Sequence, residues 1–348
     1  MDYLFLDAVS WQHSQALYHA AAHLGREALI ILRPATPYVC IGYHQDAQQE
    51  IDLEFARDHN IPVFRREVGG GAVYLDGAQL FFQLIIRADR PGVPANKAEF
   101  YRKFLQPIIE TFRQFGVPAE YKPVNDIITN GRKISGTGAA QIEDMLILVG
   151  NFIQDFNYEM MSKVLHVPDE KFRDKVFKTM SENLTTFLRE TGHIPANADL
   201  AADLAKRYEP LLGKLEQKPL DAELVQKADE LMLEMNIPEW LLANDRRRSE
   251  TAQVKIAEGI YVVQKMLKTP GGLIRVTAIN RDGHLGDVHI SGDFFFFPAP
   301  SLLELEKTLE GVYANTKTIE QVVAHFYQQH TIESPGVVPA DFANVLTV

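Results

Sequence analysis

Two arginines followed closely by three glycines are the first residues in this chain that could do chemistry. They lie in residues 64–76, which read FRREVGGGAVYLD. Glycines after an expected strand remove side chains, so that backbone can lie against a ligand and consecutive N–H groups can hold an anion. The guanidinium groups of Arg65 and Arg66 add planar donors suited to phosphate or carboxylate oxygens. The stretch indicates an anion-binding corner, with a glycine-rich hairpin carrying surface arginines as the alternative.

A lysine just after an Asn-Gly turn is the second candidate. Residues 124–141 read VNDIITNGRKISGTGAAQ, in which Asn130-Gly131 is typical of a two-residue turn between strands. Side chains alternate along a strand, so Lys133 would point to the ligand side if Ile134 packs in the core. The small residues that follow leave space, and a compact cation there could neutralise a carboxylate and the phosphate it attacks. An ordinary exposed hairpin lysine is the alternative.

The bulk composition sets limits on partners and compartment. The 348 residues are 46% hydrophobic with a formal net charge of -11, which fits a globular protein and argues against broad attraction to nucleic acid or an anionic membrane. The sequence has no apolar run of membrane-spanning length, and its N-terminus does not resemble a secretory signal. Cys40 is the single cysteine, so an internal disulfide is impossible. We expect a cytoplasmic protein.

The surrounding pattern predicts the elements that position these residues. Helices are expected at 11–24, 51–60 and 97–115, strands within 24–33 and at 38–41 and 61–64, and a mostly helical region at 160–235. The charged segment 244–250 is the best linker, with a solvated helix end as the alternative. After it, three strands are followed by two helices with capping boxes at Ser301/Glu304 and Thr318/Gln321. Residues 294–297, all Phe, fit a buried strand end better than an aromatic binding surface. The pattern predicts an α+β fold with domains at 1–245 and 251–348.

Both chemical stretches together resemble one family. RREVGGGAVYLD resembles the Arg-Arg-x-x-Gly-Gly-Gly-x-Val-x-x-Asp signature of lipoate-protein ligases, and NDIITNGRKISGTGAA resembles that family's Asn-Asp strand, hairpin and Gly-x-Lys-x-Ser-Gly segment. Residues 38–45, YVCIGYHQ, resemble its Ile-Gly-x-x-Gln strand, and residues 183–185 its later Asn-Leu segment. The resemblance covers residues 1–190 well, and the last hundred residues resemble the family's small accessory domain in size and layout.

The resemblance implies a fold shared with biotin ligases, namely a mixed-sheet catalytic domain followed by a small α/β accessory domain. It implies ATP-dependent activation of lipoate to lipoyl-AMP, with Mg²⁺, and transfer of the lipoyl group to a lysine of an acceptor lipoyl-domain protein. Lys133 would be the catalytic residue that holds the acyl carbonyl and the phosphate. Asp126 would lie near the magnesium. The residues implied for binding the nucleotide and its phosphates are Arg66, Gly70, Gly71, Ala72, Val73, Tyr74, Asn125, Asp126, Lys133 and Gly136.

Several points stay open at the level of sequence. Family members usually carry a His-Gly pair after the lysine segment, whereas this chain has Val149 before Gly150, which puts the closure of the acyl pocket in doubt. Lipoate and octanoate are not separated, and the acceptor could be a glycine-cleavage carrier, a dehydrogenase E2 domain or a lipoate-binding protein. An octanoyl or lipoyl transferase that works through a cysteine thioester is the first alternative. A non-catalytic module that binds lipoate is the second. Asp126 could also serve only to cap its hairpin.

Overall fold

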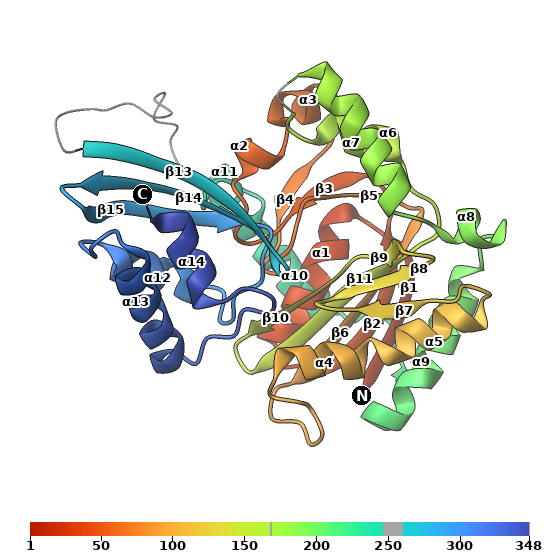
Figure 1. The fold of residues 1–348 in the computed structure, drawn as a ribbon. Coiled ribbons are helices and arrows are strands. Elements are labelled where there is room, and N and C mark those ends of the chain that lie inside the picture. Colours follow the sequence, from red (N-terminus) through yellow and green to blue (C-terminus); the bar gives the residue numbers. More distant parts are fainter. Residues whose placement is uncertain (168, 246–259, 348) are drawn as a thin grey trace. The chain divides into compact units, whose positions relative to one another are not determined.

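The computed structural model describes residues 1–167, 169–245 and 260–347 (Figure 1). These residues group into two compact units. The first contains Met1–Cys40, Glu50–Arg66 and Val73–Leu241, and the second contains Ile41–Gln49, Glu67–Ala72 and Leu242–Val348. The second unit therefore takes two short segments from the N-terminal half of the chain. The domain boundary near Asp245 stays a prediction, and residues 246–250 of the expected linker lie outside the described residues.

A mixed sheet forms the centre of the first unit. Its strands are β1 (Asp2–Val9), β2 (Ala28–Pro34), β6 (Gln79–Arg87), β10 (Thr137–Ile142), β11 (Met145–Ile153) and β12 (Glu216–Gln217). They lie in the order β10-β11-β6-β2-β1-β12, where β1 runs parallel to β2 and β12 and the other neighbours are antiparallel. The chain enters β2 directly from the predicted first helix, α1 (Trp11–His23), which the structure confirms.

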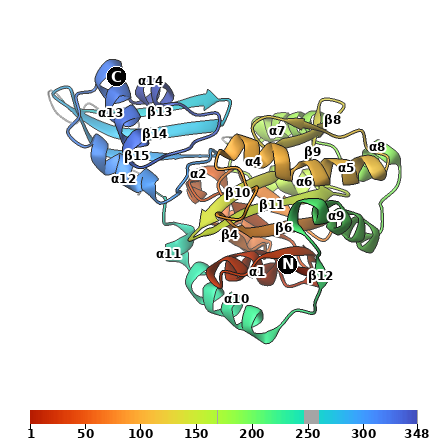
Figure 2. The ribbon, with the colours of Figure 1, turned by 90° about the horizontal axis from the view of Figure 1, so that it is seen from below.

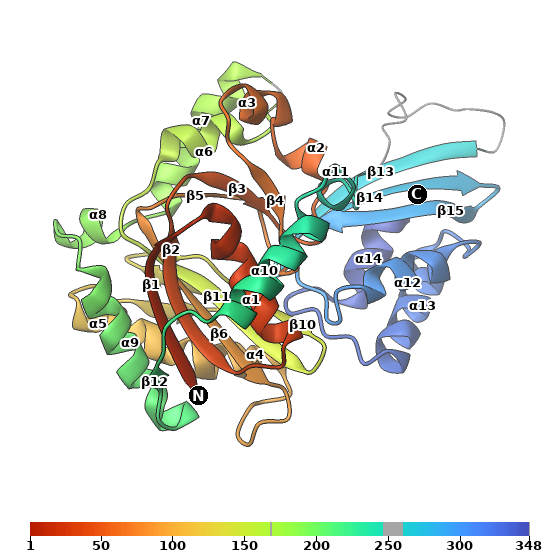
Figure 3. The same cartoon turned by 180° about the vertical axis from the view of Figure 1, so that it is seen from behind.

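Helices cover both faces of this sheet, as Figure 2 shows. On one face Gln83 of β6 donates from Nε2 to the backbone oxygen of Ser14 in α1, at 2.7 Å. The helix α10 (Ala222–Met235) packs along α1, which is seen from behind in Figure 3. On the other face, α5 (Gln106–Gln114) and α9 (Asn197–Leu212) pack together. Rings of this face form a buried aromatic cluster with centroids 4.9 to 6.4 Å apart: Phe82, Phe112, Phe152 and Phe187.

Two smaller sheets carry the residues of chemical interest. One has the order β4-β3-β5, and the other has the order β7-β8-β9. The strands of the first are β3 (Tyr38–Ile41), β4 (Val63–Arg65) and β5 (Val73–Leu75). The strands of the second are β7 (Glu120–Lys122), β8 (Asp126–Thr129) and β9 (Arg132–Ser135). The strands predicted after the Pro37 turn and after residue 60 are thus confirmed.

The prediction of a single helix at 97–115 was wrong. The structure has α4 (Lys97–Phe104) and α5, which meet at Leu105. Pro107 lies in the first turn of α5, where its missing N–H is tolerated, whereas inside a continuous helix it would remove a hydrogen bond and clash with the preceding turn. The helix predicted at 51–60 is also shorter, at α3 (Leu53–Asp58), because Asp52 caps its start.

The predicted helical region at 160–235 is confirmed as a series of separate helices. Besides α9 and α10 it contains α6 (Tyr158–Val164), α7 (Glu170–Asn183) and α8 (Phe187–Thr191). Two one-turn helices complete the described chain before residue 245: α2 (Ala47–Glu50) and α11 (Pro238–Leu241). Among the residues that the structure describes, no helix is long and apolar enough to cross a membrane.

The second unit contains the predicted antiparallel meander. Its strands are β13 (Ile260–Thr269), β14 (Gly272–Arg281) and β15 (His284–Gly292), and residues 254–259 of the predicted first strand lie outside the described residues. The meander packs against α12 (Ser301–Leu309), α13 (Thr316–Gln329) and α14 (Pro339–Leu346), the last of which was not predicted. Both predicted capping boxes are wrong. The N-cap of α12 is Pro300 without a side-chain bond, and Asn315 caps α13 by accepting from the Thr318 N–H.

The run of four phenylalanines is buried, as predicted from the sequence. All of residues 294–297 are at most 6% exposed. Phe294 and Phe296 belong to the hydrophobic core that the meander shares with α12, α13 and α14. Phe296 also lies edge-on to Phe342 of α14, with centroids 6.4 Å apart. The run therefore stabilises the second unit and does not form an exposed aromatic surface.

The aromatic cluster of the first unit gives a test of the fold. Phe152→Ala removes a fully buried ring from the contact between β11 and α5. Such substitutions typically lower the free energy of unfolding by about 3–5 kcal/mol, through lost burial and the remaining cavity. Chemical denaturation of the variant and the wild type measures the difference. A loss below about 1 kcal/mol, which is typical of exposed sites, would contradict the packing described here.

Candidate active site

The predicted hairpin around Lys133 is present. Strands β8 and β9 are antiparallel neighbours joined by Asn130 and Gly131, which adopt φ values of 50° and 76°. Both values are in the left-handed region that a two-residue hairpin turn requires and that Asn and Gly tolerate. The register shifts between Ile127 and Ile128, which places a bulge beside Ile134. The local sequence therefore fixes the turn, and the bulge adjusts where the following side chains point.

Lys133 forms an ion pair with a predicted site residue. Its Nζ lies 2.6 Å from Oδ1 of Asp126, and the two side chains are 37% and 31% exposed. Ile134 is fully buried, which is the condition under which Lys133 was expected to point away from the core. A half-exposed cation beside a carboxylate can contact an incoming ligand while the carboxylate holds it in place. Asp126 thus contacts the reactive candidate directly, in addition to any role in capping the hairpin.

Gly136 and Asn125 lie in the same neighbourhood as Lys133. A Cβ placed on Gly136 would be 3.9 Å from Cε of Lys133 and 3.7 Å from Oδ1 of Asn151. The Gly136 N–H donates to that Asn151 oxygen at 2.9 Å. Asn125 Nδ2 donates to the backbone oxygen of Thr137, and the Thr137 hydroxyl donates back to the backbone oxygen of Asn125. The structure therefore brings together Asn125, Asp126, Lys133 and Gly136.

The Asn-Leu segment at 183–185 reaches Lys133 from far along the chain. The Thr185 N–H donates to the backbone oxygen of Lys133 at 2.8 Å, and Leu184 forms a parallel bridge with Lys133. Tyr158 of α6 donates from its hydroxyl to the Leu184 oxygen at 3.0 Å. The segment thus acts as a short extra strand that fixes the backbone at the lysine.

Glu190 is a structural residue of this site that the sequence analysis missed. Its carboxylate accepts from Thr185 Oγ1 at 2.5 Å, from Asn130 Nδ2 at 2.8 Å and from Arg132 Nη2 at 2.7 Å. Burial alone would raise the pKa of Glu190, but the hydrogen bonds from Thr185 and Asn130 and the Arg132 guanidinium together lower it. One nearly buried carboxylate therefore joins the hairpin to the segment at 183–185. A Glu inside a short helix gives no sequence signal for this.

The two adjacent arginines have different environments. Arg65 is 1% exposed, and its guanidinium donates to the backbone oxygen of Leu241 at 2.6 and 3.0 Å. The expectation that both arginines serve an anion was therefore wrong for Arg65, which satisfies carbonyl oxygens at the end of α11. Arg66 is partly exposed, and its Nη1 lies 3.3 Å from the oxygen and 3.5 Å from Sγ of Cys40. Arg66 is the member of the pair that solvent reaches.

Cys40 is completely buried in β3. Its burial raises the pKa of the thiol, and the neighbouring Arg66 offsets that effect only in part. A thiol in such a setting is protonated at neutral pH, whereas nucleophilic cysteines have a lowered pKa and access to substrate. The expectation that Cys40 is buried in an apolar strand is confirmed, and the raised pKa agrees with a protonated thiol.

The glycine-rich segment belongs to the second unit from Glu67 to Ala72, whereas Val73 and Tyr74 begin β5 in the first. Gly70 has a φ of 95°, and a Cβ on Gly42 would lie 1.8 Å from the Gly70 oxygen. A Cβ on Gly69 would lie 2.9 Å from the Phe294 oxygen. Close packing therefore requires glycine at some of these positions, independently of any ligand. Gly71 is more open, because a Cβ there would come no closer than 3.7 Å to Asp293.

The N–H of Tyr74 donates to Sδ of Met161 in α6, at 3.1 Å. One backbone donor in the predicted anion-binding stretch is thus bonded within the protein. Tyr74 is 5% exposed and pairs with Val39 across the small sheet. Its backbone oxygen accepts from Gln79 Nε2 at 3.1 Å, so Tyr74 would contribute to a ligand site through the position it gives to β5.

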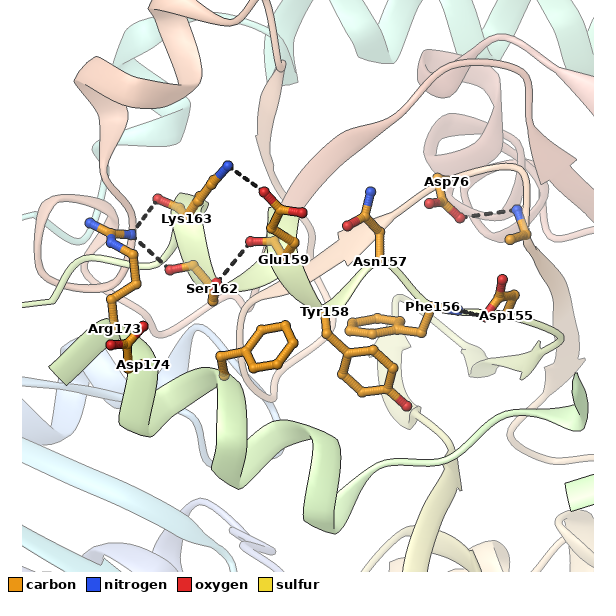
Figure 4. A pocket seen from close by; sticks show the side chains of 12 residues that line it. Asp76, Asp155, Phe156, Asn157, Tyr158, Glu159, Ser162, Lys163, Arg173 and Asp174 are labelled. Atoms are coloured by element: carbon orange, nitrogen blue, oxygen red, sulfur yellow. Dashed lines mark hydrogen bonds and ion pairs between the residues drawn. The ribbon is translucent and has the colours of Figure 1, made fainter. Parts of the chain in front are cut away.

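An open cavity of about 860 Å³ lies between the end of β5 and the helices α6 and α7 (Figure 4). Asp76, the last residue of the glycine-rich stretch, lines it and accepts from the Ala78 N–H at 3.0 Å. Burial raises the pKa of this carboxyl, with a further contribution from nearby Asp155. Rings form part of the wall: Phe156, Tyr158 and Phe177. Tyr158, which lines this cavity, is the residue whose hydroxyl donates to the Leu184 oxygen.

Two of the histidines of α1 bond to groups within the protein. His19 is buried with its Nδ1 at 2.8 Å from the Gln15 oxygen, and His23 pairs with Glu143 at 3.1 Å. Within the described part of the chain, no group of three or more His, Cys, Asp or Glu side chains is arranged to hold a metal ion.

Comparison with known proteins decides the family. A family model described as the lipoyl protein ligase A/B catalytic domain matches residues 7–208, more than half of the chain. A second, described as the bacterial lipoate protein ligase C-terminus, matches residues 261–346. The chain belongs to the lipoate-protein ligase family.

The relatives of this chain include lipoate-protein ligases and octanoyltransferases. Lipoate-protein ligase A subunit 1 of Thermoplasma acidophilum is 31% identical over 193 residues, which cover 52% of this chain and 72% of the relative. Lipoate–protein ligase 1 of Staphylococcus aureus is 25% identical over 301 residues and covers 84% of each chain. Octanoyltransferase LipM of Kyrpidia tusciae is 25% identical over 228 residues, which cover 59% of this chain and 82% of the relative. An enzyme of the ligase or transferase type is therefore supported.

Solved structures share the fold. A structure from the archaeal lipoylation system of T. acidophilum, a bi-partite lipoate protein ligase and its E2 lipoyl domain, has a TM-score of 0.62 at 24% identity and covers 71% of this chain and 98% of that one. Lipoate-protein ligase A bound with ATP has a TM-score of 0.58 at 22% identity, covering 69% and 98%. P. falciparum LipL1 in complex with lipoate has a TM-score of 0.67 at 15% identity, covering 95% of each. The predicted α+β fold with a small C-terminal domain is confirmed.

Val149, which departs from the His-Gly pair that the resemblance implied, lies on β11 opposite Gln83 of β6 and Gly138 of β10. It is partly buried, so an apolar side chain occupies this part of the sheet. Two residues on, Asn151 supplies the polar contact to Gly136. The sheet of this chain therefore carries a hydrogen-bonding side chain near the lysine segment, at a position that the sequence analysis did not single out.

Glu190→Gln tests the carboxylate that joins the hairpin to the segment at 183–185. The variant keeps the size of the side chain but loses the negative charge that accepts from Arg132. Its amide NH₂ group would also face the hydrogen-bond donors of Thr185, Asn130 or Arg132. Leaving such partners unsatisfied costs about 1–3 kcal/mol of unfolding free energy. Because the pKa of Glu190 is lowered in the folded state, the advantage of the wild type is complete above the ordinary glutamate pKa and shrinks as the pH falls through the lowered value. Denaturation curves of both proteins between about pH 7 and pH 3, a range that brackets the ordinary glutamate pKa, measure this difference in the free energy of unfolding. A difference that does not change with pH would contradict this account.

Proposed function

We propose that this protein is an ATP-dependent lipoate-protein ligase. In the first step a lipoate carboxylate oxygen attacks the α-phosphorus of ATP, which forms lipoyl-AMP and releases pyrophosphate. In the second step the amine of an acceptor lysine attacks the acyl carbonyl, an amide bond forms, and AMP leaves. No covalent bond to the enzyme is needed, so the protein has to position the reactants and stabilise charge.

The observation that carries this proposal is the Lys133 cation, held by Asp126 at 2.6 Å and bordered by Gly136, which has no side chain. The first step brings a carboxylate against a phosphate, so two negative groups must approach each other. A partly exposed ammonium beside open backbone can contact both groups and lower the charge repulsion between them. A lysine serving only as a surface charge would not need glycine next to its side chain.

The remaining proposed ligands follow the same logic. Arg66 would donate to phosphate oxygens, and the backbone of Gly70, Gly71, Ala72, Val73 and Tyr74 would border the nucleotide. Asn125 would lie near the nucleotide. Asp126 would hold Mg²⁺ together with phosphate oxygens, which fits the usual binding of this ion by one or two carboxylates and a substrate. Bound there, Mg²⁺ would neutralise phosphate charge.

The comparisons support the family and the class of enzyme on which this proposal rests. Relatives named as ligases match at 25% and 31% identity, and related structures are described with ATP, with lipoate and beside an E2 lipoyl domain. By extension we propose lipoate or octanoate as the acid and a lipoyl-domain protein as the acceptor, such as a dehydrogenase E2 domain, a glycine-cleavage carrier or a lipoate-binding protein. We also propose that it acts in the cytoplasm, with a catalytic domain at 1–245 and an accessory domain at 251–348.

The main alternative is an octanoyl or lipoyl transferase, which has relatives in the same family. Such an enzyme would pass the acyl group through a cysteine thioester. Cys40 is the single cysteine, and it is fully buried with a raised pKa. A non-catalytic lipoate-binding module is a second alternative. Arg66 and Lys133 argue against it, because binding one carboxylate does not call for two cations suited to phosphate as well.

Lys133→Met tests the assignment of the cation. The variant keeps the apolar stem beside Gly136 but removes the charge, so the fold should persist. Losing one well-placed charge stabiliser typically slows the chemical step by about 100-fold or more. Pyrophosphate release with ATP and lipoate gives the rate. Lys218→Met is a matched control, because Lys218 pairs with Asp2 of β1 at 2.9 Å, at the six-stranded sheet and not at the β7-β8-β9 sheet that carries Lys133. Unchanged pyrophosphate release in Lys133→Met would overturn the proposal.

Cys40→Ala separates the ligase from the transferase. Because the thiol is buried and protonated, we expect the variant to ligate lipoate to an acceptor domain at close to the wild-type rate, with a small loss of thermal stability from the lost packing. Mass spectrometry of the intact protein after incubation with ATP and lipoate should show no acyl-enzyme. An acyl group on Cys40 that hydroxylamine removes, together with an inactive Cys40→Ala, would favour the transferase instead.

A further inference from the structure

Two buried amide side chains connect three strands near Lys133. Gln79 begins β6 and is 1% exposed, and Asn151 lies on β11 and is 8% exposed. Asn151 Nδ2 donates to Gln79 Oε1 at 2.7 Å. At one end of the pair, Gln79 Nε2 donates to the Tyr74 oxygen on β5 at 3.1 Å. At the other end, Asn151 Oδ1 accepts from the Gly136 N–H at 2.9 Å.

The backbone groups at the two ends fix the orientation of both amides. The Tyr74 oxygen can only accept, so Gln79 must present its nitrogen there and its oxygen to Asn151. The Gly136 N–H can only donate, so Asn151 must present its oxygen there and its nitrogen to Gln79. Both ends demand the same arrangement, so flipping either amide would set like groups against each other. The pair therefore has a single hydrogen-bonded state.

Gly136 is held on its other side by close packing. Thr137 pairs with Gly150 across β10 and β11, and a Cβ on Gly150 would lie 2.8 Å from the Gly136 oxygen and 2.4 Å from the Phe82 ring. Because Gly150 has no side chain, β11 approaches the Gly136 peptide closely. The Cβ position of Gly136 also lies 3.9 Å from Cε of Lys133.

We propose that the Gln79–Asn151 pair is a positioning device that sets the Lys133 segment against β5 for adenylate formation. Asn151 acts through the Gly136 N–H, so it is a positioning residue and not a catalytic one. The inference rests on the function proposed above. It assigns to the pair the task of keeping the lysine and the strand that follows the glycine-rich segment in a fixed relation.

Asn151→Leu is the direct test, because leucine has a similar size and makes neither hydrogen bond. Small displacements of reacting groups can cost about 100-fold in rate, so we expect kcat for pyrophosphate release to fall by roughly 10- to 100-fold while KM for lipoate and ATP changes little. Asn151→Asp keeps an acceptor for the Gly136 N–H but loses the donor to Gln79. It should retain more of the activity than Asn151→Leu.

Gln154→Leu is the matched control. Gln154 is also a buried amide, 4% exposed, and its Nε2 donates to Pro195 and Asn197, away from Gly136. We expect it to lose thermal stability by an amount similar to Asn151→Leu but to keep the wild-type kcat. Equal losses of kcat in both variants would mean that the effect is general destabilisation, and would overturn the positioning role.

Hydrogen exchange of the Gly136 amide, measured by NMR, tests the contact without relying on activity. Faster exchange in Asn151→Leu than in Gln154→Leu supports the proposal when it accompanies the loss of kcat. Protected exchange at Gly136, a wild-type kcat, or a loss confined to KM in Asn151→Leu would each overturn it. A wild-type protein that releases no pyrophosphate from ATP and lipoate would instead refute the proposed ligase function, and exchange at Gly136 would still report whether Asn151 holds that peptide.

Discussion

The position of the Lys133 ammonium depends on constraints applied to its backbone from several sides. The hairpin pairs it with β8, Thr185 donates to its backbone oxygen at 2.8 Å, and Asp126 holds its Nζ at 2.6 Å. A lysine side chain has many rotamers, and fixing them costs free energy that one exposed ion pair does not recover. Backbone contacts from distant segments reduce the conformations that remain. The surrounding structure is therefore organised around one short strand.

Two arginines from the two chemical stretches are used for structure, which leaves fewer cations for chemistry. Arg65 is buried against the carbonyl oxygens of Leu241, and Arg132 is bonded to Glu190. A buried charge is tolerated only when such partners satisfy it, and removing a partner is costly. Arg66 and Lys133 keep partial exposure. The difference between the two neighbouring arginines shows that charge alone does not mark a ligand-binding residue.

Glycines in the second unit serve packing as well as any ligand. Gly42 lies against Gly70, and Gly69 lies against Phe294, at distances that exclude a side chain. The phenylalanine run is thus linked to the glycine-rich segment by contact within one unit, although more than 200 residues separate them in the chain. Substitutions at these glycines would alter the fold of this unit and any anion binding together. Activity losses at Gly69 and Gly70 are for this reason weaker indicators of a ligand contact than losses at the more open Gly71.

Local sequence determined the Asn130-Gly131 turn, the helix α1, the meander β13 to β15 and the burial of Ile134, because these follow from turn chemistry and short-range periodicity. The two motifs also determined the family. Only the tertiary structure decided that Glu190, Asn151 and Gln79 surround the lysine segment, since hydrogen bonds between residues 15 to 72 positions apart leave no pattern in a single sequence. The break at Leu105 and the cap at Asn315 are, by contrast, local features, namely Pro107 in the first turn of α5 and an Asn three residues before Thr318, which the sequence analysis did not use.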